Sequence, residues 1–223
     1  MSPRVLSRAL TSPALPRLAV GVTIAVSAAL AGIPAFADDH QATDQSSISR
    51  ANAAPARQSA RLTADALIRV AESQIGVTEN AVGGGTPFHN WYMTSPRAAE
   101  TVARDGGNIR AYANAPWCAM FVSWVGEKAG LRSTVGWDAY TITWAKWFKA
   151  NKRWGTVAKP GAVVYFSWDS KTIDSIDHMG LVKKDNGDGT ITTIEGNTGN
   201  GKVEQRVRPT SQVVGYGYPQ YKA

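Results

Sequence analysis

The sequence contains one cysteine, Cys118, and three histidines in 223 residues. A single thiol cannot form an intramolecular disulfide, and metal sites that need two cysteines are excluded. Repeats of the length typical of solenoids and propellers are absent as well. Charged residues are sparse at 18% and form no block of one sign, while 43% hydrophobic residues supply enough apolar surface for a core. A wholly disordered chain is therefore excluded.

Acidic residues are absent from the first 37 positions, which hold three arginines. A basic start is followed by a mostly apolar stretch of 16 residues, 18–33, and by small residues at Ala35 and Ala37. This pattern is typical of a secretory signal peptide, and we expect cleavage after Ala37. An uncleaved anchor is the alternative, but a helix that spans a bilayer needs roughly 20 apolar residues. We therefore expect a secreted protein with no stable membrane association.

The remaining chain has 21 basic and 17 acidic residues over 186 positions, a net charge of +4. Its Lys and Arg are scattered and no helix-turn-helix or zinc pattern occurs, so nucleic-acid binding is not expected. Residues 38–61 contain one large aliphatic residue, Ile48, and predict a disordered linker or propeptide. The folded part is then a single domain over residues 62–223, which we expect to act as a monomer.

Helical patterns fill the first half of this domain. Thr63 is a predicted cap for a helix that ends at Gly76, with Ala66, Leu67, Val70, Ala71 and Ile75 on its apolar side. Residues 116–129 predict a second helix that is apolar all round and therefore buried, with Ala115 as its cap. Residues 140–150 predict a third helix, with most of its aromatic side chains on one side.

From Lys159 onward the hydrophobic period becomes two, which is typical of strands. Strands are predicted at 163–168, 179–183, 191–195, 203–207 and 213–218, and residues 185–189 form the turn of a hairpin. Helices followed by an antiparallel sheet indicate an α+β domain.

Cys118 is the third residue of the buried helix if Ala115 is its cap. The unpaired N–H groups and the positive end of the helix dipole would then favour its thiolate, the nucleophilic form of cysteine. A buried cysteine that only fills the core is the alternative. Among the histidines, His40 is in the linker and His89 follows a glycine-rich loop, whereas His178 starts a strand and is the candidate base.

The hairpin connects His178 to two polar residues. If the numbers of paired residues sum to 373 or 375, His178 lies opposite Glu195 or Asn197 and shares a face with both. An even sum would put His178 and Glu195 on opposite faces. In the odd register, Glu195 or Asn197 would accept a hydrogen bond from the imidazole and fix its tautomer.

Three motifs in this order resemble a CHAP domain, the cysteine- and histidine-dependent amidohydrolase/peptidase family. They are APWCAMFVSWV around Cys118, DHMGLV around His178 and TTIEGNTG, which holds Glu195 and Asn197. The resemblance extends over roughly residues 62–221 and implies a papain-like fold, with helices that include the cysteine-bearing one packed on the sheet. It implies Cys118 as nucleophile, His178 as base and then acid, and Glu195 as the orienting residue. Asn197 matches a position that often joins this group.

Two departures from the family pattern concern residues outside this set. Ala162 stands where many relatives have Asp after Pro-Gly, which bears on local structure more than on activity. The acidic calcium-binding loop that some relatives have before the cysteine is also missing, since residues 112–115 contain no carboxylate. We therefore expect no metal and no cofactor.

The resemblance implies hydrolysis of an amide in bacterial peptidoglycan, in or near the cell wall. Two bonds are open: the bond between muramic acid and L-alanine, or one within the stem or cross-bridge peptide. Three other functions also stay open, namely a catalytically idle wall-binding module, a thiol acyltransferase and a general secreted cysteine protease.

Overall fold

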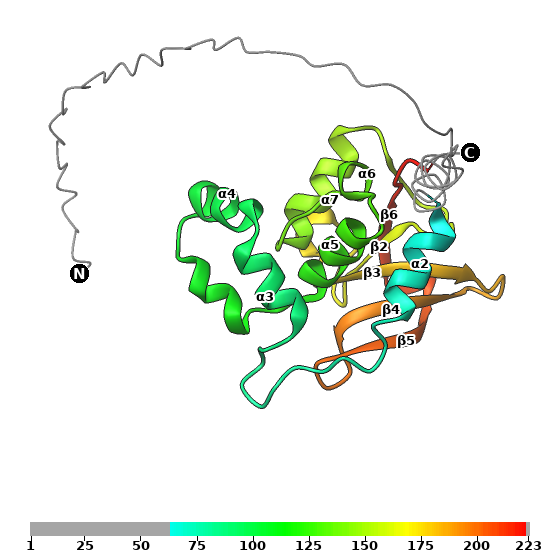
Figure 1. Ribbon diagram of the computed structural model, residues 1–223. Coiled ribbons are helices and arrows are strands. Elements are labelled where there is room, and N and C mark those ends of the chain that lie inside the picture. The colour runs from blue at the N-terminus through cyan, green and yellow to red at the C-terminus, as the bar shows by residue number, and fades with distance from the viewer. Residues whose placement is uncertain (1–62, 222–223) are drawn as a thin grey trace, which may run out of the picture. The chain divides into compact units, whose positions relative to one another are not determined.

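The computed structural model describes residues 63–221 (Figure 1). The predicted signal peptide and the predicted linker, together with Leu62 and the last two residues, lie outside the described residues. The statements below concern the predicted domain alone.

Helices form the first half of the domain and strands form the second. The helices are α2 (Ala64–Glu72), α3 (Pro87–Thr94), α4 (Pro96–Asp105), α5 (Cys118–Lys128), α6 (Arg132–Val135) and α7 (Thr141–Ala150), with 3-10 turns η1 (Ile109–Asn114), η2 (Ile173–Ser175) and η3 (Thr210–Gln212). The strands are β1 (Trp154–Gly155), β2 (Val163–Phe166), β3 (His178–Asp185), β4 (Thr190–Thr198), β5 (Lys202–Pro209) and β6 (Val213–Gly217). They form one antiparallel sheet in the order β1-β6-β2-β3-β4-β5. The predicted α+β class is confirmed.

The first helix begins where the sequence predicts and ends earlier. The side chain of Thr63 accepts a hydrogen bond of 3.1 Å from the backbone N–H of Ala66, which caps α2. The helix ends at Glu72, so the prediction that it continues to Gly76 is wrong. Ile75 lies in a turn beyond it and is 47% exposed rather than on the buried face. The apolar spacing therefore predicts the first two turns of α2 correctly. Ile75 continues that spacing only by coincidence.

Two helices, α3 and α4, occupy a segment in which the sequence patterns above predict no element. Thr86 caps α3 and Ser95 caps α4, and in each case proline follows as the first helical residue. A hydroxyl residue before proline is a helix-start signal, and this signal could have located both helices. His89 follows the glycine-rich loop, as expected, and is a buried residue of α3.

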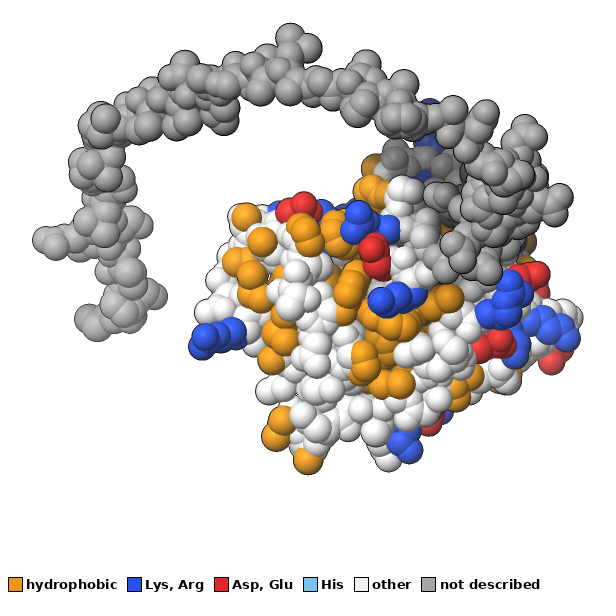
Figure 2. All heavy atoms as spheres, in the orientation of Figure 1, with side chains coloured by type: hydrophobic (Ala, Val, Ile, Leu, Met, Phe, Trp, Pro, Cys, Tyr) orange, Lys and Arg blue, Asp and Glu red, His pale blue; other side chains and the backbone are white. Residues whose placement is uncertain are grey.

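The sheet has a different core on each face. Helix α5 is buried on nearly all sides and belongs to one cluster with Met179, Leu181 and Ile194. The alternate strand residues, among them Phe166 and Val182, form a second cluster on the opposite face. In Figure 2, hydrophobic side chains reach the visible surface mainly over the helical part of the molecule.

The register between β3 and β4 changes along the hairpin. Near the turn, Asp185 pairs with Ile191, so the paired numbers add up to 376. A bulge between Val182 and Lys184 shifts the pairing, and Leu181 pairs with Ile194, which gives 375. Of the two registers that the sequence leaves open, the odd one therefore holds at the end of the hairpin that contains His178, and the even one holds beside the turn.

Close packing of Gly196 against α5 gives a first prediction. A Cβ at this buried position would lie 2.6 Å from Cβ of Phe121 and 2.8 Å from Cζ3 of Trp117. We expect Gly196→Ala to lower the free energy of unfolding by about 1–3 kcal/mol, because overpacking forces neighbours to move. Urea unfolding measures this change. Val207→Thr, at an exposed position of β5, is the control and should change it by less than about 0.5 kcal/mol; equal effects would contradict the packing argument.

Candidate active site

His178 and Glu195 form a buried hydrogen-bonded pair. His178 Nε2 lies 2.9 Å from Glu195 Oε2, and both residues are on the sheet face opposite α5. Gly180 makes this possible, because a Cβ there would lie 2.7 Å from Cγ of Glu195. The glutamate side chain therefore passes over Gly180 toward the imidazole. Since the carboxylate occupies Nε2, the other ring nitrogen, Nδ1, is left to face a second group.

Cys118 lies close enough to His178 to raise the pKa of the imidazole, and it is the first residue of α5. The predicted helix began two residues too early: Trp117 has the non-helical angles φ −119° and ψ 13° and is the N-cap, so Cys118 is the first helical residue and not the third. No side chain caps this helix start. The backbone N–H of Cys118 is one of the orphan donors of the first turn, and the side chain is 6% exposed.

Two loop contacts hold the backbone before Cys118 out of the helix. Trp117 is fully buried, and its indole Nε1 donates a 2.7 Å hydrogen bond to Glu79 Oε2. His89 donates from Nε2 to the carbonyl of Ala115 at 3.0 Å, while its Nδ1 lies 2.7 Å from Oγ1 of Thr86. Both ring nitrogens of His89 are thereby engaged, so this histidine is a structural residue that orients the cysteine-bearing segment.

The surroundings of His178 favour its cationic form. Burial lowers its pKa, but the hydrogen bonds to Cys118 and then to Glu195, with their charges, outweigh burial and raise the pKa from 6.5 to about 9. The imidazole is therefore protonated at neutral pH and lies between a thiol and a carboxylate. This arrangement suits an acid that delivers a proton to a leaving group.

Arg208 and Thr193 hold the carboxylate in place. Arg208 binds Glu195 in bidentate fashion, with Nε 3.0 Å from Oε1 and Nη2 2.6 Å from Oε2. Oγ1 of Thr193 donates to Oε1 at 2.6 Å. Burial raises the pKa of Glu195, but His178 and then Arg208 outweigh it and lower the pKa to about 2. The fully buried side chain is thus a carboxylate with three partners.

Sequence reasoning missed Arg208, which lies 13 positions after Glu195. In the register of β4 and β5, Arg208 pairs with Ile191, a member of the second cluster, and so shares the face that holds Glu195. No motif marks this arginine. Period-two alternation along both strands is the only signal that could have placed it on this face.

Two aromatic rings complete the surroundings of the imidazole. Phe166 pairs with His178 across β2 and β3, and its ring stacks on the imidazole with 6.0 Å between the ring centroids. The ring of Trp168 also stacks on the imidazole, with a centroid distance of 6.2 Å. The guanidinium of Arg208 lies 5.6 Å from the Phe166 ring and 5.4 Å from the Trp168 ring. These contacts restrict rotation of both the imidazole and the guanidinium.

Asn197 lies apart from the three residues that the structure brings together. Extending the register at 375 puts it opposite His178, and its φ of 55° turns the backbone at this point. Within residues 63–221 its side chain makes no hydrogen bond with Cys118, His178 or Glu195. The close cluster is therefore Cys118, His178 and Glu195, with Arg208 behind it.

A pocket of about 190 Å³ opens beside the thiol. Its walls come from the residues before and within α5, from the start of α7 and from the loop before β3, and they include Tyr112, Cys118, Tyr140, Thr141 and Asp177. Cys118 therefore lies at the edge of this cavity.

Residues 110–197 match the family model described as CHAP domain. The match confirms the resemblance inferred from the motifs and contains Cys118, His178 and Glu195 but not Arg208. CHAP domains are cysteine- and histidine-dependent amidohydrolase/peptidase domains. Comparison with curated proteins and with solved structures found no match.

The imidazole pair gives a prediction for titration. Because the pKa of His178 is raised on folding, its proton stabilises the fold fully below pH 6.5, and this contribution is lost as the pH rises through about 9. We expect an NMR titration midpoint of His178 well above 6.5, and a lower midpoint in Cys118→Ala and in Glu195→Gln. Glu204→Gln, whose carboxylate pairs with Arg206 instead, is the control and should leave the midpoint unchanged. A midpoint of 6.5 or below in the wild type would refute the arrangement.

The buried carboxylate gives a prediction for stability. We expect Arg208→Ala to lower the free energy of unfolding by about 2–4 kcal/mol, because it leaves Glu195 buried with fewer partners. Arg206→Ala, two residues away in an exposed ion pair with Glu204, should cost less than about 1 kcal/mol. Denaturant unfolding of both variants measures the difference, and equal losses would show that Arg208 is an ordinary surface arginine.

Proposed function

We propose that this protein is a secreted peptidoglycan hydrolase that cleaves an amide bond by metal-free Cys–His–Glu catalysis. The observation that carries the proposal is a thiol at a helix start that faces a protonated imidazole, whose other nitrogen is held by a buried carboxylate. The CHAP match over residues 110–197 gives the substrate class. A papain-like arrangement is part of the proposal and is supported by the cysteine on the helix and the histidine on the sheet.

In the proposed reaction Cys118 is the nucleophile. Its sulfur, as the thiolate beside the His178 imidazolium, attacks the amide carbon and forms a C–S bond, while the carbonyl electrons move to oxygen. The backbone N–H of Cys118 is free of a helical partner and is proposed to donate to this oxyanion.

His178 is the proposed acid and then base. Collapse of the tetrahedral intermediate breaks the C–N bond, and the imidazolium gives its proton to the departing amine. Water then loses a proton to the neutral His178 and attacks the thioester; cleavage of the C–S bond releases the carboxylic acid and regenerates the Cys118 thiolate beside the His178 imidazolium. A proton held on His178 at neutral pH supports the first of these steps.

Glu195 is the proposed orienting residue, because its hydrogen bond fixes which ring nitrogen faces the sulfur. Arg208 and Thr193 in turn fix the carboxylate. Asn197 is proposed as a fourth, peripheral member because the hairpin register puts it opposite His178.

The proposed substrate is a wall peptide or its junction with muramic acid, and the protein is proposed to act outside the cell. The pocket beside Cys118, lined by polar as well as apolar residues, supports a peptide-like ligand. Across residues 63–221, no helix has the length and apolar character that crossing a membrane requires.

Digestion of purified peptidoglycan tests the proposal. We expect the mature protein to release fragments with newly formed amine and carboxyl ends, identified by mass spectrometry, with or without EDTA. Cys118→Ala should reduce the rate by about 10³-fold or more, because the nucleophile is removed. Cleavage that survives this substitution, or that EDTA abolishes, would refute the mechanism; no cleavage of several wall types by folded, reduced protein would refute the function.

A further inference from the structure

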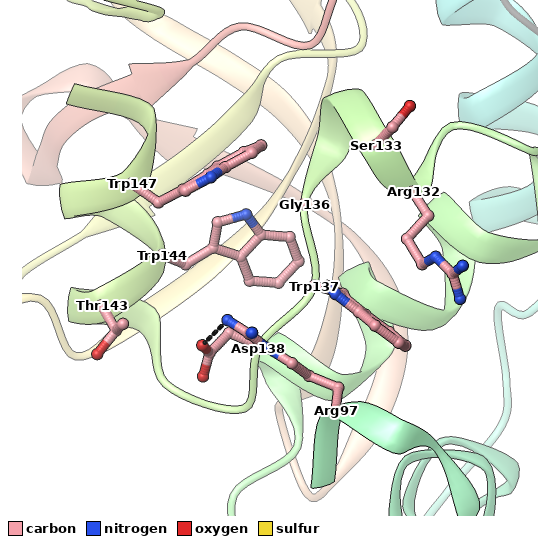
Figure 3. A pocket seen from close by; sticks show the side chains of 9 residues that line it. All are labelled: Arg97, Arg132, Ser133, Gly136, Trp137, Asp138, Thr143, Trp144 and Trp147. Atoms are coloured by element: carbon pink, nitrogen blue, oxygen red, sulfur yellow. Dashed lines mark hydrogen bonds and ion pairs between the residues drawn. The ribbon is translucent and has the colours of Figure 1, made fainter. Parts of the chain in front are cut away.

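A second pocket lies between α6 and α7 and has a different lining. It has a volume of about 360 Å³, within the range of small-ligand sites, and three of its residues are Trp137, Trp144 and Trp147 (Figure 3). Figure 3 shows the indole of Trp144 between those of Trp137 and Trp147. Gly136 allows this, because a Cβ there would collide with Trp144 and would lie 2.8 Å from Cζ3 of Trp147.

The three indoles differ in what they contribute to the fold. Trp144 is 2% exposed and donates from Nε1 to the carbonyl of Val135 at 2.8 Å, so it is a core residue that forms the pocket floor. Trp137 and Trp147 are partly exposed, and within residues 63–221 neither indole N–H has a hydrogen-bond partner. Core packing therefore accounts for Trp144. Trp147 also packs against the core, and the guanidinium carbon of Arg153 lies 4.4 Å from its ring centroid, so Trp137 is the indole that the fold leaves most available to a ligand.

Hydrogen-bond donors dominate the polar part of this pocket. The guanidinium carbon of Arg132 lies 4.3 Å from the centroid of the Trp137 ring. This half-exposed arginine also forms an ion pair of 3.2 Å with Glu127, so it is not an unused donor. Arg97 is bound to Asp138, yet its Nε is buried and has no partner among the described residues. Asp138, the only carboxylate in the lining, is already bound by Arg97 and Arg104. The pocket thus offers unused donors and no unused carboxylate, which favours a ligand rich in oxygen acceptors.

The position of the pocket connects it with the proposed active site. Trp137 and Asp138 line it, whereas the next residues, Ala139, Tyr140 and Thr141, line the pocket beside Cys118. The Cα atoms of Trp137 and Tyr140 are three residues apart and so at most about 11 Å from each other. One segment of backbone therefore borders both pockets.

We propose that the pocket of Trp137 and Trp147 binds an N-acetylated amino sugar of a glycan strand. A sugar ring has an apolar face that stacks on indole and a rim of oxygen atoms for the arginine and indole donors. Its acetamido carbonyl is a further acceptor. The choice of an N-acetylated glycan rests on the proposed function, with the peptide attached to that glycan entering the pocket beside Cys118.

Binding of a sugar without peptide tests this inference apart from hydrolysis. The probe is the β-1,4-linked tetramer of N-acetylglucosamine, which holds no wall peptide, added to Cys118→Ala protein. We expect saturable shifts of the Trp137 and Trp147 indole N–H signals in NMR spectra. Trp137→Ala should weaken binding at least tenfold, Arg132→Ala should weaken it several-fold, and the control Trp91→Ala, outside the pocket, should leave it unchanged.

Two further measurements keep the test decisive. Thermal unfolding of each variant checks that the fold is retained, and Trp137→Phe, which keeps an aromatic face, should bind more tightly than Trp137→Ala. Absence of tetramer binding, or shifts at other tryptophans, would overturn the inference. Binding of a sugar-free stem peptide that depends on Trp137 would overturn it in favour of a peptide site. Failure of the wild-type protein to hydrolyse peptidoglycan would refute the proposed function. The sugar-binding inference would then be decided by the tetramer-binding result alone.

Discussion

The site depends on one buried negative charge. Glu195 is fully buried in the sheet, and a carboxylate in that position is tolerated only because His178, Arg208 and Thr193 surround it. The same contacts determine the imidazole's tautomer, its orientation and its protonation. The charge at Glu195 is thus one of the two causes of the raised pKa of His178, together with Cys118, and its hydrogen bond orients the imidazole.

Cys118 lies on one side of the sheet, and His178 and Glu195 lie on the other. They can meet only at the end of a strand. Cys118 belongs to the helical layer with Met179 and Leu181, whereas His178 and Glu195 lie on the opposite face. His178 is the first residue of β3, and this end position allows a side chain of one layer to meet a side chain of the other. The hairpin bulge sets the register that permits it, and the contacts of His89 and Trp117 set where α5 begins.

Local patterns predicted much of this arrangement. The cap at Thr63, the buried helix after Pro116 and the hairpin around residues 185–189 follow from hydrogen-bonding side chains, apolar periodicity and strand alternation, whereas the register of the hairpin stays open between an odd and an even sum. The predicted start of α5 is two residues too early. The reason is that two hydrogen bonds, from Trp117 to Glu79 and from His89 to the carbonyl of Ala115, hold residues 115–117 out of the helix. Arg208 could not be found because its partner lies across two strands, and the roles of the tryptophans depend on burial, which their spacing does not reveal.

The account's central claim is that Cys118 forms a covalent bond with the acyl group while His178 moves the proton. Acid-quenched mass spectrometry of the enzyme during turnover of a wall-peptide substrate tests this claim most directly. The account predicts a mass increase equal to the acyl fragment, located on the peptide that contains Cys118 and absent from Cys118→Ala. Substrate turnover without an acyl adduct, in either the wild-type enzyme or Glu195→Gln, would contradict the claim. An adduct on a residue other than Cys118 would contradict it as well.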